Sequence, residues 1–318
     1  ANAIQGVGAT GGIINYTTTR PANGGAGEVR VEAGVTADTD FNGDGYGYRG
    51  AVTGLKDFGD FDWVGSVALE TRGAFYDGDG RRIGVDGTQG EIQDSQSLNV
   101  FTKAGWDIAA DTRLEFMANI FELEGDGDYI QIAGDRATGV PAISVRGDTE
   151  GEIPTNSVNT FSLTFTQSDL FGGKLSAQGF YREFESVFGG GTFDGFFNTG
   201  DEAPGEFTFD QSSNISDKTG VKLTYSHSDL PIQGMTVTGG LDVLSDESSQ
   251  ILVQTGRLWV PEVEFVSIAP FLQFDQLLLN DRILVSAGLR QENATLNVAD
   301  FTTIFSSNST QVEGGEPD

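Results

Sequence analysis

The sequence of 318 residues contains no cysteine and only one histidine. The missing cysteines exclude a disulfide framework, a thiolate metal site and a thiol nucleophile. The histidine, His227, lies between serines at an expected turn, so its surroundings support no nucleophile and base pair. Paired carboxylates stay open, because their separation in space is invisible in a sequence. No pattern favours an enzyme, and we expect neither a catalytic residue nor a cofactor.

Basic residues and long apolar runs are also scarce. Lys and Arg number 18 against 47 Asp and Glu, which gives a formal net charge of −29. A field of this sign repels phosphate backbones, so we expect no nucleic-acid partner. The mean hydropathy is −0.21, and no run approaches the ~18 consecutive apolar residues that a membrane-spanning helix needs. The chain is therefore either soluble or crosses a membrane as strands.

The sequence does contain apolar and polar residues that alternate with a period of two, in segments of about ten residues. This is the length of a tilted strand that crosses a bilayer. In residues 28–35, valines and an alanine point to one face, while Glu28, Arg30 and Glu32 point to the other. The fold class is therefore all-β. About eleven strands are expected, at residues 28–35, 46–55, 61–71, 98–106, 114–120, 161–165, 175–181, 221–225, 237–243, 266–274 and 283–289.

The connections between these segments alternate between short and long along the chain. Short turns with Gly, Pro, Asn and Asp are expected near residues 56–60, 107–112, 169–173, 229–234 and 275–281. Long polar loops are expected at residues 74–97, 124–157, 186–217 and 245–262, with a shorter one at 38–45. Short turns on one rim and long loops on the other are typical of an antiparallel transmembrane β-barrel of the outer membrane.

Aromatic residues near strand ends also favour a bilayer. Trp63, Trp106, Tyr181 and Tyr225 fall where the aromatic girdles of the two membrane interfaces are expected. A soluble sandwich could show the same alternation, so the loop asymmetry makes most of the distinction. Bacterial single-chain barrels have an even number of strands, so about eleven leave an unpaired edge. We therefore expect a partial barrel, and both chain ends read as interior sequence of a longer protein.

The amino-terminal residues 6–21 open on the pattern G-x-G-x-x-G. A dinucleotide site needs a following helix, whereas β-branched and aromatic residues follow here and end at Pro21. A glycine turn that enters a strand is the plainer interpretation. The stretch also resembles the end of the plug domain of TonB-dependent outer-membrane receptors, although Thr17-Thr18-Thr19 replaces the usual Val-Thr-Lys. The residues that carry this resemblance are Gly8, Gly11, Gly12, Ile13, Ile14, Asn15, Arg20 and Pro21. Residues 269–290 resemble a mid-barrel hairpin of the same family.

The resemblance implies a plug inside a 22-stranded barrel, of which this chain would supply about 11 strands. Residues 1–21 would be the C-terminal end of the plug domain, and residues 22–318 the N-terminal part of the barrel. Such receptors import ferric siderophores or other scarce nutrients across the bacterial outer membrane with energy from the TonB complex. The implied partners are outer-membrane lipid, a ferric siderophore and, for the full-length protein, TonB. The TonB box and most of the plug are expected to lie outside this sequence, so the fragment alone should not couple to TonB.

One acidic loop matches the first half of an EF-hand calcium loop, with glycine at the sixth position. Its twelfth position is Arg49, where a bidentate Glu is needed, and no flanking helix is evident. A solvated acidic loop is the plainer interpretation, so we expect no metal site. The weak calcium candidates are Asp38, Asp40, Asn42 and Asp44.

Another loop holds Phe193, Phe196 and Phe197 among glycines. These aromatic side chains would either grip a ligand or pack against the barrel mouth. Two other functional classes stay open beside an active receptor. A passive porin or adhesin barrel would lack the plug-like lead-in, and a soluble secreted β-rich binding protein would need no detergent.

Overall fold

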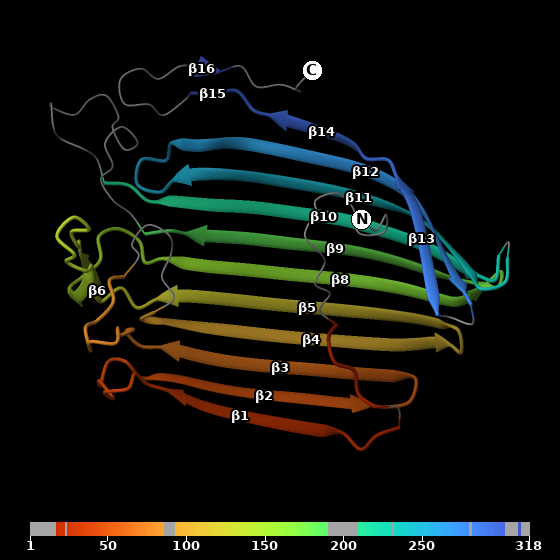
Figure 1. Ribbon diagram of the computed structural model, residues 1–318, viewed down its shortest axis with the longest axis horizontal. Coiled ribbons are helices and arrows are strands. Elements are labelled where there is room, and N and C mark those ends of the chain that lie inside the picture. Colours follow the sequence, from red (N-terminus) through yellow and green to blue (C-terminus); the bar gives the residue numbers. More distant parts are fainter. Residues whose placement is uncertain are drawn as a thin grey trace.

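The computed structural model describes residues 17–22, 24–85, 93–189, 209–230, 232–279, 282–302 and 311–312. This part of the chain consists of β-strands joined by turns and loops (Figure 1). It contains no helix long and apolar enough to span a bilayer.

One large antiparallel sheet makes up most of the structure. Its strands are β1 (Glu28–Thr36), β2 (Gly47–Asp57), β3 (Phe61–Arg72), β4 (Ser95–Ala109), β5 (Thr112–Gly125), β8 (Thr155–Leu170), β9 (Gly173–Val187), β10 (Ser212–Ser228), β11 (Met235–Leu252), β12 (Leu258–Leu278), β13 (Ile283–Arg290) and β14 (Asn293–Val298). Two small ribbons are formed by β6 (Tyr129–Ile132) with β7 (Ile143–Arg146), and by β15 (Phe301–Thr302) with β16 (Gln311–Val312).

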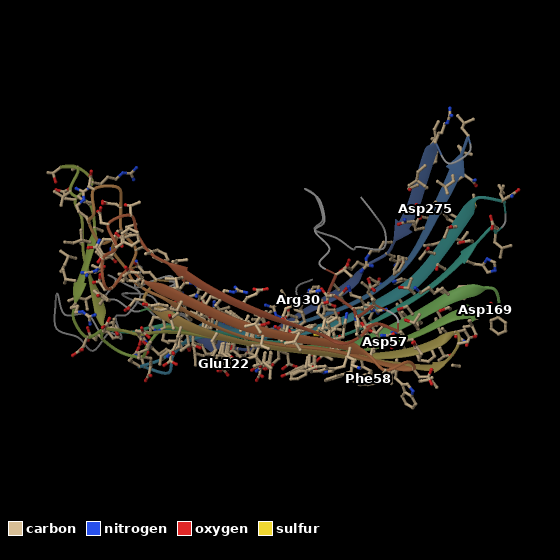
Figure 2. The ribbon with its side chains drawn as sticks, turned by 90° about the horizontal axis from the view of Figure 1, so that it is seen from below. Arg30, Asp57, Phe58, Glu122, Asp169 and Asp275 are labelled. Atoms are coloured by element: carbon tan, nitrogen blue, oxygen red, sulfur yellow. The ribbon has the colours of Figure 1, made fainter. Side chains whose placement is uncertain are left out.

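Neighbouring strands of the large sheet follow one another along the chain, as in a barrel wall. Eleven strands lie on the path from β1 to β13, and β14 pairs with β12 beyond the end of β13. The sheet curves into an open trough with a concave and a convex side (Figure 2). The expected all-β antiparallel fold, with about eleven strands of an unclosed barrel, is confirmed.

The strand register places the apolar positions on the convex side. Val31, Val52, Val67, Val100 and Ile120 are direct cross-strand neighbours on β1 to β5. Val31 is 72% exposed and Val52 is 51% exposed, so no described part of this chain covers the row. A continuous, uncovered apolar band across a sheet is the surface that contacts lipid in a transmembrane barrel. Charged and amide side chains alternate with it on the concave side, which is the lumenal wall.

The two rims differ as expected, with one correction. The short turns span residues 58–60, 110–111, 171–172, 229–234 and 279–282, and the longest connections span 37–46, 73–94, 126–154 and 188–211. The expectation of a long loop at residues 245–262 is wrong, because β11 and β12 leave only residues 253–257 between them. Residues 245–250 of β11 are all polar, and Pro261 interrupts the outer end of β12, so neither segment shows the apolar alternation that marks a strand.

Candidate functional site

A segment of irregular structure, residues 17–22, lies against the lumenal wall. The ammonium of Lys103 on β4 donates to the backbone oxygen of Thr18 at 3.2 Å and to its hydroxyl at 2.7 Å. Arg20 forms an ion pair with Glu115 on β5 at 2.5 Å. Lys103 is only 2% exposed. Because a buried ammonium needs acceptors, these contacts fix the segment to β4 and β5.

Glu115 belongs to a larger group of charges on the same wall. The guanidinium of Arg113 contacts Asp62 at 2.5 Å, Asp107 at 3.0 Å and Glu115 at 3.7 Å. Gly105 makes room for it, because a Cβ atom there would lie 1.8 Å from Arg113 Nη2. The glycine thus lets one arginine join carboxylates from β3, β4 and β5.

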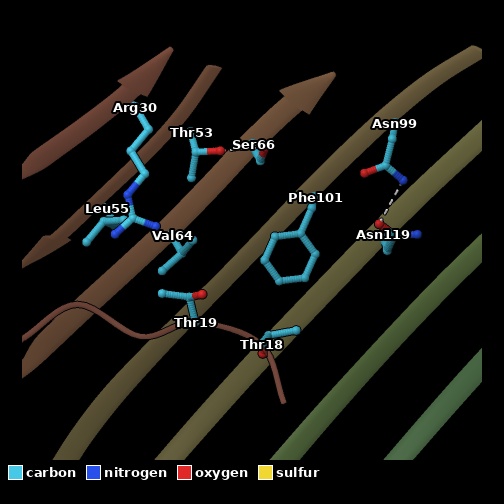
Figure 3. A pocket seen from close by; sticks show the side chains of 10 residues that line it. All are labelled: Thr18, Thr19, Arg30, Thr53, Leu55, Val64, Ser66, Asn99, Phe101 and Asn119. Carbon is cyan, nitrogen blue, oxygen red and sulfur yellow. Dashed lines mark hydrogen bonds between the residues drawn. The ribbon is translucent and has the colours of Figure 1, made fainter. Parts of the chain in front are cut away.

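A cavity of about 310 Å³ lies between the segment and the wall. Thr18 and Thr19 form one side of it, and polar and apolar side chains together form the floor (Figure 3). Thr53 and Ser66 share a hydrogen bond of 2.9 Å across this floor, and Asn99 donates to Asn119 at 3.1 Å. The other side chains that line the cavity are Arg30, Leu55, Val64 and Phe101.

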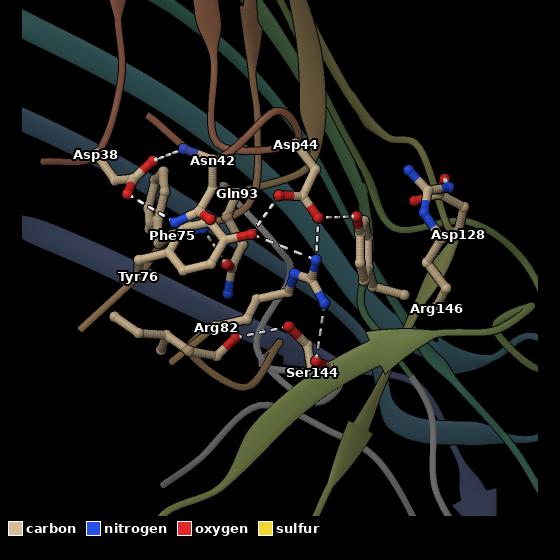
Figure 4. A network of polar contacts seen from close by, with 12 residues as sticks. Asp38, Asn42, Asp44, Phe75, Tyr76, Arg82, Gln93, Asp128, Ser144 and Arg146 are labelled. Atoms are coloured by element: carbon tan, nitrogen blue, oxygen red, sulfur yellow. Dashed lines mark hydrogen bonds and ion pairs between the residues drawn. The ribbon is translucent and has the colours of Figure 1, made fainter. Parts of the chain in front are cut away.

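A second polar cluster joins three loops at the rim of long connections, here called the outer rim (Figure 4). The carboxylate of Asp44, in loop 37–46, accepts hydrogen bonds from the hydroxyls of Tyr76 and Tyr129 and from Arg82. The Tyr129 contact is 2.8 Å long. Tyr76 and Arg82 lie in loop 73–94, and Tyr129 begins β6 in loop 126–154. Burial opposes ionisation of Asp44, but these three donors outweigh it and lower its pKa to about 2.

The guanidinium of Arg82 also stacks on both tyrosine rings. Its central carbon lies 4.6 Å from the ring centre of Tyr129 and 5.7 Å from that of Tyr76. Arg146 of β7 lies 5.0 Å from the same Tyr129 ring and forms an ion pair with Asp128. Alternating rings and guanidinium groups of this kind attract one another through the ring quadrupole. The three loops therefore form one connected unit, which we call the Asp44 cluster.

The carboxyl of Asp94 lies near those of Asp128 and Asp126, where loop 126–154 leaves the wall. Burial, a hydrogen bond with Asp128 and the negative charges of Asp128 and Asp126 raise the pKa of Asp94 to about 7, although Arg146 opposes the rise. The backbone of the same residues is tied as well, because Asp126 N donates to Asp94 O at 2.8 Å. The ionisation of Asp94 is thus linked to the base of the loop.

Two of the weak calcium candidates, Asp38 and Asp44, have different partners in the structure. Asp38 accepts from the backbone nitrogens of Asp40 at 3.0 Å and of Asn42 at 2.9 Å, so its carboxylate shapes its own turn. Asp44 faces Arg82 instead. In the ranges that the structure covers, no three acidic or histidine side chains are placed to hold a metal ion.

A further tie between outer loops is formed by residues that the sequence did not single out. Asp210 and Gln211 are 0% and 1% exposed. Asp210 accepts from Gln254 N at 2.9 Å, and Gln211 exchanges hydrogen bonds with the backbone of Glu152 at 2.5 and 2.7 Å. The sequence shows only two adjacent polar residues at this position, Asp210 and Gln211. No local pattern distinguishes them from residues of a solvated loop.

Several expected site residues fall outside this geometry. Of the plug-like motif, Arg20 and Pro21 are described, and Arg20 reaches Glu115. The remaining motif residues Gly8, Gly11, Gly12, Ile13, Ile14 and Asn15, and the loop aromatics Phe193, Phe196 and Phe197, lie outside the described residues.

Comparison with known proteins gives relatives that are similar in sequence. No family model matches the chain. It is 30% identical to the rhizobactin receptor of Rhizobium meliloti (strain 1021) over 194 residues, covering 57% of this chain and 25% of that protein. It is 26% identical to the ferric aerobactin receptor of Escherichia coli over 329 residues, covering 95% of this chain and 42% of that protein. The chain thus spans less than half the length of these relatives.

Solved structures show the same fold. The copper transporter OprC gives a TM-score of 0.63 at 14% identity, covering 93% of this chain and 42% of that one. A mutant of the ferric enterobactin receptor PfeA from Pseudomonas aeruginosa, in complex with enterobactin, gives 0.61 at 12% identity, covering 95% and 48%. The named relatives are receptors and a transporter, not enzymes.

An unclosed antiparallel wall with an apolar convex face and a polar lumen defines part of a transmembrane β-barrel. The sequence similarity to the rhizobactin and ferric aerobactin receptors bears out the resemblance to TonB-dependent receptors that the sequence suggested.

Proposed function

We propose that the whole protein imports a ferric siderophore across the bacterial outer membrane, with energy passed on by the TonB complex. The observation that carries this proposal is the similarity to ferric aerobactin receptors along 95% of the chain. The lumenal wall suits such a role, since its charged and amide side chains can line an aqueous path for a polar chelate. The convex face would contact outer-membrane lipid.

Within this proposal, residues 1–21 are the end of the plug domain and residues 22–318 belong to the barrel. The contacts of Thr18 with Lys103 and of Arg20 with Glu115 support this division, because they dock the segment 17–22 inside the trough. The loop aromatics Phe193, Phe196 and Phe197 stay candidate ligand contacts.

Uptake of radio-iron as ferric aerobactin, by cells with and without the gene, tests the proposal. We expect uptake to depend on the gene and to stop when a protonophore collapses the proton gradient that energises TonB. Gene-dependent uptake that continues without the gradient would instead favour a passive porin. Equal uptake by both strains of ferric aerobactin and of other ferric siderophores would contradict the proposed role.

A further inference from the structure

An arginine on the lumenal wall has no counter-charge among the described residues. Arg182 lies on β9, on the face that carries Lys103, and its side chain is exposed. It forms no ion pair with any residue that the structure describes. The other described arginines on strands of the large sheet all form ion pairs, and they are Arg30, Arg49, Arg72, Arg113 and Arg290.

The direct neighbour of Arg182 on β10 is a second cation, Lys218. The ammonium of Lys218 is held by Asp246 on the next strand, at 2.7 Å. Like charges that lie directly opposite one another in a sheet repel, because their Cβ atoms are only about 5 Å apart. Asp246 neutralises one of the two charges and leaves the guanidinium with a net attraction for an anion.

Beside this charge the wall is apolar, where a barrel lumen is normally polar. Phe121, Val158 and Phe184 are direct cross-strand neighbours on β5, β8 and β9, one step nearer the outer rim than Arg182. All three are half-buried. The guanidinium lies 6.0 Å from the centre of the Phe184 ring, so the ring face and the charge form one surface.

A glycine next to Lys218 lets another aromatic ring pack against the wall. The Phe180 ring lies over Gly220, where a Cβ atom would come within 2.4 Å of the ring. The glycine thus lets the ring lie close to the wall between Arg182 and Lys222. We call Phe121, Val158, Arg182, Phe184 and Lys218 the Arg182 patch.

We propose that the Arg182 patch binds the cargo of the receptor, and that this cargo is an anionic iron chelate with an apolar portion. A guanidinium recognises a carboxylate through paired hydrogen bonds, and the adjacent apolar row accepts the hydrocarbon part of the same molecule. A free inorganic anion would use only the charge, and a neutral chelate only the apolar row. The inference rests on the proposed function and specifies its substrate class.

Binding to the purified full-length receptor in detergent tests the inference. The probes are an anionic ferric carboxylate-hydroxamate chelate and a neutral ferric trihydroxamate chelate, and the variants are Arg182→Gln and Lys222→Gln. Lys222 is the matched control, because it is another exposed lumenal cation without an ion pair to a described residue. We expect Arg182→Gln to weaken binding of the anionic chelate roughly tenfold or more. Lys222→Gln should change it less than about twofold.

The other possible results each overturn a different statement. Equal weakening by both variants, or none by Arg182→Gln, would overturn the assignment of the patch. Wild-type receptor that binds only the neutral chelate would overturn the anionic cargo and leave iron import standing. Wild-type receptor that binds no ferric chelate would overturn the proposed function, and the inference with it.

Discussion

Asp44 joins three outer loops because its two carboxylate oxygens accept hydrogen bonds from Tyr76, Tyr129 and Arg82. An amide in the same place offers one acceptor oxygen and leaves Arg82 without its counter-charge. Hydrogen bonds to a charged group stabilise by about 1.5–3 kcal/mol each. We therefore predict that Asp44→Asn raises amide hydrogen exchange in loops 37–46 and 126–154 at least about tenfold.

The strands should keep their protection in this variant, since the cluster lies outside the wall. Asp40→Asn is the control, because the structure shows no hydrogen bond to the Asp40 carboxylate among its described contacts. Unchanged exchange in Asp44→Asn would contradict the role of the cluster in joining the loops.

The carboxyl of Asp94 gives the same region a dependence on pH. Its pKa rises from the ordinary value of 3.8 to about 7 in the fold, through burial and the nearby Asp128 and Asp126. A carboxyl with a raised pKa stabilises the folded state fully below pH 4 and loses this contribution as pH rises toward 7. We predict that residues 126–130 become less protected from exchange between pH 5 and 8, after correction for intrinsic rates. Asp94→Asn should remove this dependence, and a variant that keeps it would contradict the assignment.

At the scale of single elements, β10 presents alternate residues to lipid and to the lumen. Val221 lies in the convex apolar band between Gly179 and Val243, whereas Thr224 faces the lumen. An arginine on the lipid face near the bilayer midplane costs about 2–4 kcal/mol. We predict a loss of this size in the free energy of unfolding for Val221→Arg, and less than about 1 kcal/mol for Thr224→Arg, measured by denaturant titration in lipid vesicles. Equal losses would place both positions in the same environment.

The segment 17–22 is another element whose placement depends on few contacts. Lys103 and Glu115 bind Thr18 and Arg20, so their removal should release the segment from the wall. We predict that Lys103→Met and Glu115→Gln each increase the mobility of a spin label at position 19 in electron paramagnetic resonance. Glu70→Gln is the control, because Glu70 pairs with Arg49 and Arg72 and not with the segment. An unchanged spectrum in all variants would contradict the conclusion that Lys103 and Glu115 hold the segment against the wall.

The elements also show where sequence patterns suffice. The alternation of valine with charged residues in residues 28–35 predicts β1 and its faces, because one face needs lipid and the other water. It fails for the outer end of β11, where residues 245–250 are all polar, and for the outer end of β12, which contains Pro261. The Asp44 cluster was missed for a related reason, since Asp44, Arg82 and Tyr129 are brought together by loops that carry no periodic signal.

On the scale of the whole molecule, the chain forms one side of a lipid-embedded wall around a polar lumen. It contains no cysteine, so each cysteine introduced into it is the sole thiol of this part of the protein. The most direct test places single cysteines along β10 in the full-length protein in outer membranes, at lumenal positions 218, 222 and 224 and at lipid-facing positions 221, 223 and 225. We predict that a water-soluble thiol reagent labels the lumenal set, and that only a lipid-soluble reagent labels the other. Equal labelling of both sets by the water-soluble reagent would show a soluble sheet and contradict the barrel wall on which the proposed transport depends.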